Sequence, residues 1–209
     1  GGFAGTETNL SQRDITVNQT ILSGEIWGDT AAMKDFASLH VNLISASTIF
    51  DGVTVKGGNA NGSFSWTYPR DEFYDQGGGF YVSGSSTLTL RNCTITGNNA
   101  MEFGGAIMME AGNGLVSASN TTFSLNTVTS FHLSTFNVAG GAIYGDVNAT
   151  NCAFKDNTVT ANPLDSDSAP TTAIARGGAI YGDVTALSCT FSTNRAVSSG
   201  TENTSSFAS

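Results

Sequence analysis

Two aspartates at matching places in a repeated segment are the residues best arranged for chemistry. Asp146 and Asp183 each follow a Tyr-Gly pair and precede a valine. A carboxylate pair can act as general acid and base or hold calcium, but such sites also need a third carboxylate or an aligned basic residue. No such residue is aligned with the pair, so we expect both aspartates to lie in solvated turns.

The other reactive side chains do not form a recognisable site either. The two histidines, His40 and His132, are far apart, and no CxxC pair or cysteine–histidine spacing typical of a metal site occurs. The sequence therefore predicts no catalytic residue, no metal ligand and no cofactor. The three cysteines are Cys93, Cys152 and Cys189, and we expect them as buried thiols, with a Cys152–Cys189 bridge as the alternative.

One segment has the composition of a contact surface. Residues 64–74 hold five aromatic side chains together with an arginine and a proline. Large rings and arginine are the side chains that contribute most to binding energy at protein interfaces. We predict a partner-binding site formed by Trp66, Tyr68, Arg70 and Tyr74, the alternative being that the rings fold back onto the domain.

Composition and charge limit the classes of partner that the chain can bind. The chain has 209 residues, a net charge of −9 and only 12% charged residues, and it shows no lysine or arginine cluster. We therefore expect no nucleic-acid partner, and the negative charge also disfavours peripheral docking on anionic lipid. No apolar run approaches the roughly 20 residues that span a bilayer. Because the sequence opens abruptly at Gly1-Gly2-Phe3, we expect any membrane attachment to come only through parts absent from this fragment.

An internal repeat organises most of the chain. Residues 140–157 and 177–194 are identical at 12 of 18 positions, and both begin Gly-Gly-Ala-Ile and end in Phe-x-x-Asn. A weaker copy runs from Gly104 to Asn126, and another from Gly78-Gly79-Phe80-Tyr81 to Asn98. Within each copy apolar and polar residues alternate, which indicates strands with one buried face.

Short strands broken by glycine and asparagine at a fixed period predict an all-β fold, a right-handed parallel β-helix. Leucine-rich repeats and β-propellers are excluded because their signatures are missing. We predict one domain over residues 1–197, with irregular rungs over 1–50 and repeats over 51–197, followed by a loose tail or truncated insertion at 198–209. Residues 60–77, 99–103, 127–139 and 158–176 are predicted to be variable insertions on one side of the coil. The last of them, residues 158–176, should be exposed, and shortening it should leave the melting temperature nearly unchanged.

Two residue types recur at fixed rung positions. Phe123, Phe154 and Phe191 are expected to stack inside the coil. The closing asparagines are expected to adopt a left-handed φ and to bond neighbouring amides; they are Asn98, Asn126, Asn157 and Asn194.

These motifs carry a family resemblance. GGAI at 104–107, 140–143 and 177–180, with FxxN at 123–126, 154–157 and 191–194, resembles the repeat pair of the polymorphic outer membrane proteins of chlamydiae. GGFAGTET at the start and FDGVTVKGGNANG at 50–62 resemble large bacterial surface proteins with β-helix repeats. No C-terminal membrane β-barrel of the chlamydial kind is present in this sequence.

The resemblance implies an exported structural and adhesive stalk at the cell surface, associated with the outer membrane and not an enzyme. Its partners would be a host cell, a glycan, a matrix component or neighbouring segments of the same surface protein. The alternative is a carbohydrate-active or glycan-binding β-helix similar to polysaccharide lyases. A third class, ice-binding proteins, is disfavoured because Thr87-Leu88-Thr89 is not repeated on the next rungs.

Overall fold

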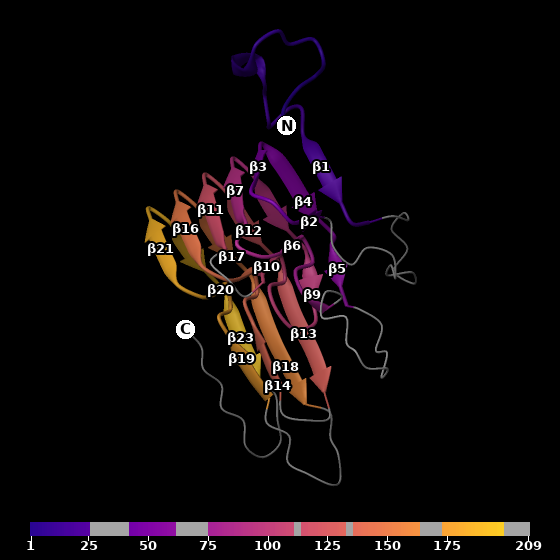
Figure 1. The fold of residues 1–209 in the computed structure, drawn as a ribbon, viewed down its shortest axis with the longest axis vertical. Coiled ribbons are helices and arrows are strands. Elements are labelled where there is room, and N and C mark those ends of the chain that lie inside the picture. The colour runs from indigo at the N-terminus through magenta and orange to yellow at the C-terminus, as the bar shows by residue number, and fades with distance from the viewer. Residues whose placement is uncertain (26–41, 62–74, 111–113, 133–135, 164–172, 199–209) are drawn as a thin grey trace.

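The computed structural model describes residues 1–25, 42–61, 75–110, 114–132, 136–163 and 173–198. In these residues the chain is almost entirely β-structure, and every pair of neighbouring strands is parallel. One short 3₁₀ helix, η1 (Leu10–Gln12), lies near the N-terminus. The predicted all-β fold and parallel β-helix are confirmed (Figure 1).

Three sheets form the walls of the coil. The first, sheet B, contains β2 (Asn42–Ile44), β6 (Phe80–Val82), β10 (Ile107–Met109), β15 (Ile143–Tyr144) and β20 (Ile180–Tyr181). The second, sheet C, contains β3 (Thr48–Asp51), β7 (Thr87–Arg91), β11 (Leu115–Ser119), β16 (Val147–Thr150) and β21 (Val184–Leu187). The third, sheet A, contains β1 (Thr20–Ser23), β4 (Val53–Lys56), β8 (Thr94–Thr96), β12 (Thr122–Ser124), β17 (Ala153–Lys155) and β22 (Thr190–Ser192).

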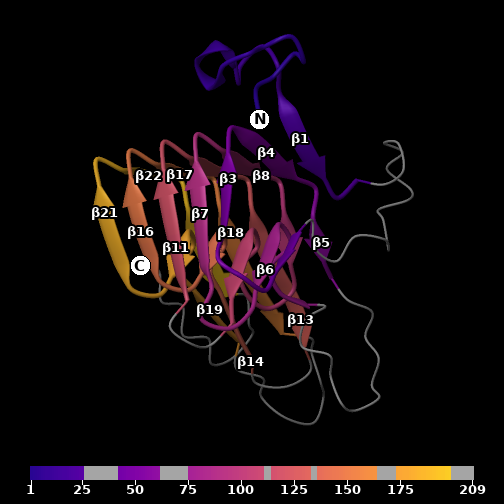
Figure 2. The same ribbon diagram turned by 45° about the horizontal axis from the view of Figure 1, so that its top comes forward.

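Two more sheets extend from one corner of this coil. Sheet D contains β5 (Asn59–Ala60), β9 (Asn99–Ala100), β13 (Thr127–His132), β18 (Thr158–Pro163) and β23 (Arg195–Ser198). Sheet E contains β14 (Phe136–Ala139) and β19 (Ala173–Arg176). Each coil runs through sheets B, C, A and D in that order, and successive coils lie side by side in chain order, as the colours in Figure 2 show.

In-register pairing places the same side chain of each repeat in one row. Phe123 pairs with Phe154, and Phe154 pairs with Phe191. Their rings stack nearly parallel, with centroids 4.8 and 4.7 Å apart. Phe123 and Phe154 are fully buried, so the predicted inward stack is confirmed.

A second row consists of the closing asparagines. The backbone N–H and the Nδ2 of Asn126 both donate to Oδ1 of Asn157, at 3.1 and 3.0 Å. Asn98 donates in the same way to Asn126, and Asn157 to Asn194. The predicted amide ladder is therefore confirmed.

The predicted backbone conformation of these asparagines is wrong. The residue before each one has the positive φ: Gly97 at 63°, Leu125 at 57°, Asp156 at 55° and Thr193 at 55°. A left-handed residue there turns the chain so that the asparagine side chain points inward toward the next coil. Asparagine is needed at its position for its amide and not for a left-handed φ.

Each glycine of the repeated Gly-Gly pair has a different role. Gly140 has a φ of 71°, which L-residues rarely adopt. A Cβ on Gly141 would lie 2.1 Å from the carbonyl oxygen of Gly178 in the next coil, so the second glycine permits close approach of the coils. Phe80 pairs with Ile107. The copy that begins at Gly78 is therefore shifted by one residue from the alignment with the Gly104 copy that the sequence suggested.

The parts of the connections that the structure describes as β13, β14, β18 and β19 are strands and not the exposed loops that we predicted for residues 158–176. The strands of sheets D and E pack a second hydrophobic core, separate from the one inside the coil. Val159 and Ala161 from β18 and Ala173 and Ala175 from β19 are fully buried in it. Shortening residues 158–176 would remove core strands, so we now expect it to destabilise the fold.

The cysteines occupy one row beside sheet A, where Thr121 takes the place of a fourth. All three are free thiols, so the alternative of a Cys152–Cys189 bridge is not seen. Cys93 and Cys152 are buried, and this burial raises the pKa of both thiols. Cys189, in the last coil, is half-buried, and its Sγ accepts a hydrogen bond from the N–H of Cys152.

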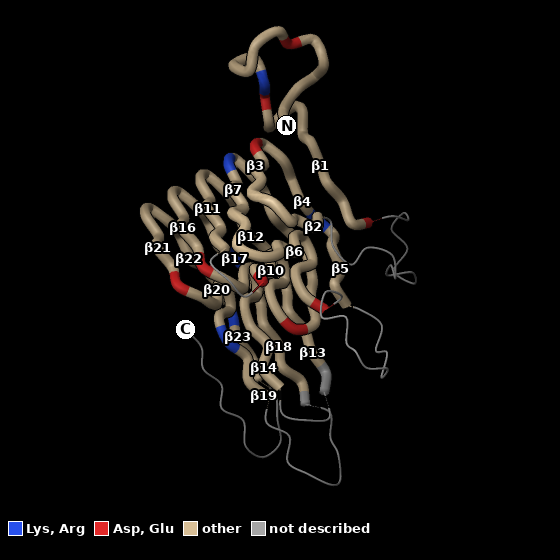
Figure 3. The backbone as a smooth tube through the Cα atoms, viewed as in Figure 1, with Lys and Arg blue, Asp and Glu red and all other residues tan. Residues whose placement is uncertain are grey.

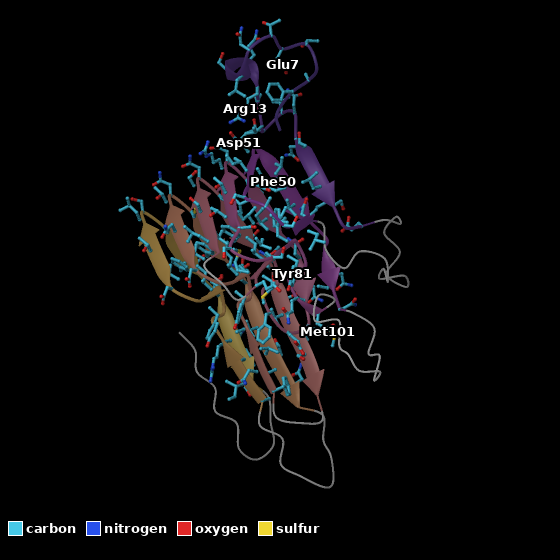
Figure 4. The ribbon with its side chains drawn as sticks, viewed as in Figure 1. Glu7, Arg13, Phe50, Asp51, Tyr81 and Met101 are labelled. Carbon is cyan, nitrogen blue, oxygen red and sulfur yellow. The ribbon has the colours of Figure 1, made fainter. Side chains whose placement is uncertain are left out.

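The N-terminal segment is attached to the first coil through Asp51. Arg13 Nη2 donates to Oδ1 of Asp51 at 2.9 Å, and Asn92 Nδ2 donates to the same oxygen. The terminal amino group of Gly1 donates to the Asp51 backbone carbonyl. Figure 4 shows Arg13 and Asp51 where this segment meets the coil.

The first prediction concerns the phenylalanine stack. Phe154→Ala should lower the free energy of unfolding by about 3–5 kcal/mol, because it opens a cavity between two rings. Phe191→Ala should cost clearly less, because that ring is half exposed. Denaturant melts of the two variants measure the difference. Equal losses would show that the stack does not depend on burial.

The second prediction concerns the amide ladder. Asn157→Ala should cost at least about 2 kcal/mol, because it leaves the buried N–H and Nδ2 of Asn126 without their acceptor. Asn148→Ala, at an exposed position of β16 in the same coil, is the control and should change stability less. Urea unfolding at constant pH is the measurement, and similar losses for both variants would contradict the ladder's role.

The third prediction concerns pH. Burial opposes ionisation of Asp51, but the hydrogen bonds from Arg13 and Asn92 and the nearby positive charges outweigh it and lower its pKa. A lowered native pKa adds stability that is present above the unfolded value of about 3.9 and is lost as pH falls through the native value. The melting midpoint should therefore fall between pH 5 and pH 2, and less so in Asp51→Asn.

Two other carboxyls of the N-terminal segment also have lowered pKa values, so they contribute to the pH dependence of stability in both proteins. Hydrogen bonds from backbone amides, led by that of Ala4, lower the pKa of Glu7, and the hydroxyl and backbone amide of Thr16 help lower that of Asp14. Both remain in Asp51→Asn, so the variant isolates the Asp51 contribution. An identical pH dependence in the two proteins would show that Asp51 does not secure the segment.

Candidate functional site

The binding residues predicted from the sequence lie outside the described residues. Trp66, Tyr68, Arg70 and Tyr74 all fall within residues 62–74. Their proposed role in contacting a partner stays a prediction.

The two aspartates lie where the sequence predicted, in exposed turns between sheets B and C. Oδ1 of Asp146 accepts a hydrogen bond from the backbone N–H of Asp183 at 3.0 Å. One carboxylate therefore connects the turns of two adjacent coils. Within the described ranges, no three or more His, Cys, Asp or Glu side chains are grouped so as to hold a metal ion.

The outer face of sheet B carries a row of large side chains. On β15 and β20 the isoleucine points inward, so the tyrosine after it points outward. In-register pairing aligns Tyr81 with Met108, Met108 with Tyr144, and Tyr144 with Tyr181. We call these four residues the outer aromatic row.

The exposure of this row increases toward the last coil. Tyr81 and Met108 are buried, Tyr144 is half-buried, and Tyr181 is 36% exposed. The Tyr144 and Tyr181 rings stack with centroids 5.3 Å apart, and Phe103 packs against Tyr144 at 4.7 Å. Figure 4 places Tyr81 at the middle of the molecule, between the coil and sheets D and E, which we call the side sheets.

The polar ends of the row lie among few charged groups. Burial, with a smaller contribution from Tyr181, raises the pKa of the Tyr144 phenol, so it stays protonated at neutral pH. Arg176 Nη1 donates to the Tyr181 hydroxyl at 3.5 Å. Figure 3 shows most charged residues at turns and at the ends of strands, and few within the strands.

This arrangement is suited to binding. Rigid rings with phenolic hydroxyls and one guanidinium provide apolar area together with hydrogen bonds, which suits a protein or sugar partner. The residues that present this surface are Phe103, Tyr144, Arg176 and Tyr181.

These residues were not singled out from the sequence, although a signal was present. Ile-Tyr occurs at 143–144 and again at 180–181. Because the isoleucine belongs to the buried face, period two requires the tyrosine to face outward. A repeated outward aromatic residue has no core role of its own and is therefore a candidate for contact.

Comparison with known proteins agrees with the coil geometry. A family model described as a right-handed beta helix region matches residues 41–208. The chain belongs to the right-handed β-helix family. Searches of curated proteins and of solved structures gave no match. The match to the β-helix family covers the repeats and also the less regular β2 and β3 strands.

The described residues contain one short helix, η1. No helix there has the length and apolar character needed to cross a membrane.

Proposed function

We propose that this β-helix is a non-catalytic structural and adhesive module of a secreted or cell-surface protein. Its repeat is similar to that of the chlamydial polymorphic outer membrane proteins, and this similarity supports a position outside the cell, associated with an outer membrane. The observation that carries the proposal is the unbroken stacking of equivalent side chains from coil to coil.

That stacking supports a spacer role. The asparagine row continues through four coils, and each link uses two donors on one acceptor. The phenylalanine row runs beside it. Because every coil holds its neighbours through the same contacts, length can be added without changing the packing.

The outer aromatic row supports a contact role. Tyr144, Tyr181 and Phe103 are held by ring packing, so a partner that covers them orders few rotatable bonds. Elsewhere the outward positions of sheets A and C are mainly Thr, Ser and Asn, which offer less apolar area to desolvate. The predicted site at Trp66, Tyr68, Arg70 and Tyr74 is a second candidate for the same role.

The competing proposal, a lyase-like enzyme, rests on Asp146 and Asp183. These carboxylates are adjacent, but Oδ1 of Asp146 accepts a backbone hydrogen bond across the turn. This favours a structural use of Asp146. Polyuronate incubation with calcium tests the alternative directly. Unsaturated products that disappear in Asp146→Asn would replace our proposal with the enzyme.

Adhesion of the purified chain to cells and to a glycan array tests the proposal itself. Tyr144→Ser with Tyr181→Ser should reduce adhesion at least about fivefold, because hot-spot aromatic residues dominate contact energy. A second variant changes Trp66, Tyr68, Arg70 and Tyr74 to alanine and tests the predicted site separately.

The matched control is Ile49→Ser with Leu187→Ser. Both side chains are exposed on sheet C, away from the outer aromatic row. The control removes similar exposed apolar area and should leave adhesion unchanged. Adhesion that persists in both test variants, with unchanged melting curves, would remove both candidate sites. Failure of the natural chain itself to adhere would remove the adhesive part of the proposal and leave a spacer.

A further inference from the structure

The row of cysteines beside sheet A brings two thiols together in adjacent coils. Cys152 and Cys189 each come directly before a strand of that sheet, and the residues that follow them, Ala153 and Thr190, are paired in parallel register. The N–H of Thr190 donates to the carbonyl oxygen of Cys152 at 2.9 Å. The N–H of Cys152 donates to Sγ of Cys189 at 3.4 Å. The second thiol therefore lies one coil further along the axis from the first.

The spacing of these two positions suits a disulfide. Neighbouring strands of one sheet lie about 4.8 Å apart, and the Cα atoms of bridged cysteines are usually about 4.4–6.8 Å apart. The Cβ atoms of stacked side chains lie about as far apart as the strands, whereas bridged Cβ atoms are about 3.5–4.5 Å apart. A bond between the sulfurs would therefore draw the two coils slightly together. A strained disulfide of this kind is readily reduced again.

The third cysteine is held out of reach by a threonine. Thr121 occupies the row between Cys93 and Cys152, and the strands that follow these three residues pair in that order. Two strand spacings, about 9–10 Å, therefore separate Cys93 from Cys152, which is too far for a disulfide. The fold thus permits one bond among the three thiols of the chain.

The packing of this row accepts a hydroxyl as well as a thiol. The N–H of Cys93 donates to Oγ1 of Thr121 at 3.3 Å, which is the contact that Cys152 makes with Sγ of Cys189. Thr121 is 1% exposed, so a hydroxyl fits even where the position is fully covered. Thiols in two successive coils therefore offer a reaction that packing does not explain.

The two thiols differ in how they meet a reagent. Cys152 is buried, and this burial, with a smaller contribution from Cys189, raises its pKa, so it is protonated at neutral pH. Cys189 is half-buried and is reached first from solvent. Their S–H groups donate to the carbonyl oxygens of Thr150 and Leu187 at 3.3 and 3.4 Å. Such weak hydrogen bonds leave both sulfurs free to rotate toward each other.

We infer that Cys152 and Cys189 form a thiol–disulfide exchange site, which reacts with a small-molecule disulfide such as oxidised glutathione to give a reversible bond between two coils. The register that places one thiol beside the other carries the inference. It does not depend on the adhesive role proposed above, and its test does not involve adhesion.

The reaction consists of two exchanges. The thiolate of Cys189 attacks one sulfur of the small disulfide, whose S–S bond breaks; a mixed disulfide forms, and the departing thiolate takes a proton from water. Cys152 then gives its proton to solvent, and its thiolate attacks Sγ of Cys189 and releases the second small thiol. The protein loses two hydrogens, and the small disulfide is reduced to two thiols.

The test treats the folded natural chain with one equivalent of oxidised glutathione at mildly alkaline pH, followed by acid quenching and trypsin digestion without reductant. Cleavage after lysine and arginine leaves Cys152 in residues 92–155 and Cys189 in residues 177–195. The two peptides joined by a disulfide should be at least about tenfold more abundant than the mixed disulfide of Cys189, because the second thiol is already beside it. Since residues 92–155 also contain Cys93, the Cys93→Ser variant assigns the bond and should give the same result.

An excess of reduced glutathione should afterwards return the protein to its thiol form. A bond that persists under this treatment would overturn the inference of a reversible site. So would a folded natural chain that yields only mixed disulfides or bonds between separate chains, because the two thiols would then not be placed for exchange.

Two controls ask whether the fold selects the pair. Cys189→Ser retains Cys93 and Cys152 but should form no bond between them, because the coil of Thr121 keeps them apart. In urea the natural chain should lose its preference, and a bond from Cys93 to Cys152 should appear as a loss of two hydrogens from residues 92–155. That same bond in folded Cys189→Ser, or an equal preference in native buffer and in urea, would overturn the inference.

Discussion

The parallel, in-register stacking of asparagine side chains is the constraint on which the rest of this structure depends. Each buried amide would cost free energy if left alone, but each obtains its acceptor from the same residue one coil further on. A coil displaced by one residue would lose both hydrogen bonds and would also turn the neighbouring phenylalanine away from the core. The polar ladder therefore fixes the register, and the rings beside it supply the apolar burial.

Much of this could be predicted from the sequence because the signal is repeated. Identity between residues 140–157 and 177–194 places the same side chain at the same point of each coil. The burial of Phe123 and Phe154 and the amide ladder follow from it. The left-handed residues could not be assigned in this way, because glycine, leucine, aspartate and threonine share one position and only the backbone path selects them.

The side sheets, sheets D and E, could not be predicted from the repeat. The connections that form β13, β14, β18 and β19 differ in length and share little sequence, so the sequence predicted loops there. Val128, Val159 and the alternating alanines of β19 were a weak indication of buried strands. This indication was not supported by a matching segment in the other repeats. For the outer aromatic row the obstacle was the reverse. Tyr144 and Tyr181 belong to a conspicuous repeat. Because the repeat as a whole was explained by turns and core packing, these two outward-facing tyrosines were not considered separately.

The direction of the hydrogen bonds between coils has a mechanical consequence. These bonds run along the axis of the helix, whereas the covalent chain runs around it. A load applied along the axis is therefore borne in series by successive coil-to-coil contacts, each of which carries the full force. Under tension such a helix would lengthen by releasing coils one at a time, so its extension under force would be stepwise. Its resistance would be set by its weakest junction and not by how many coils it contains.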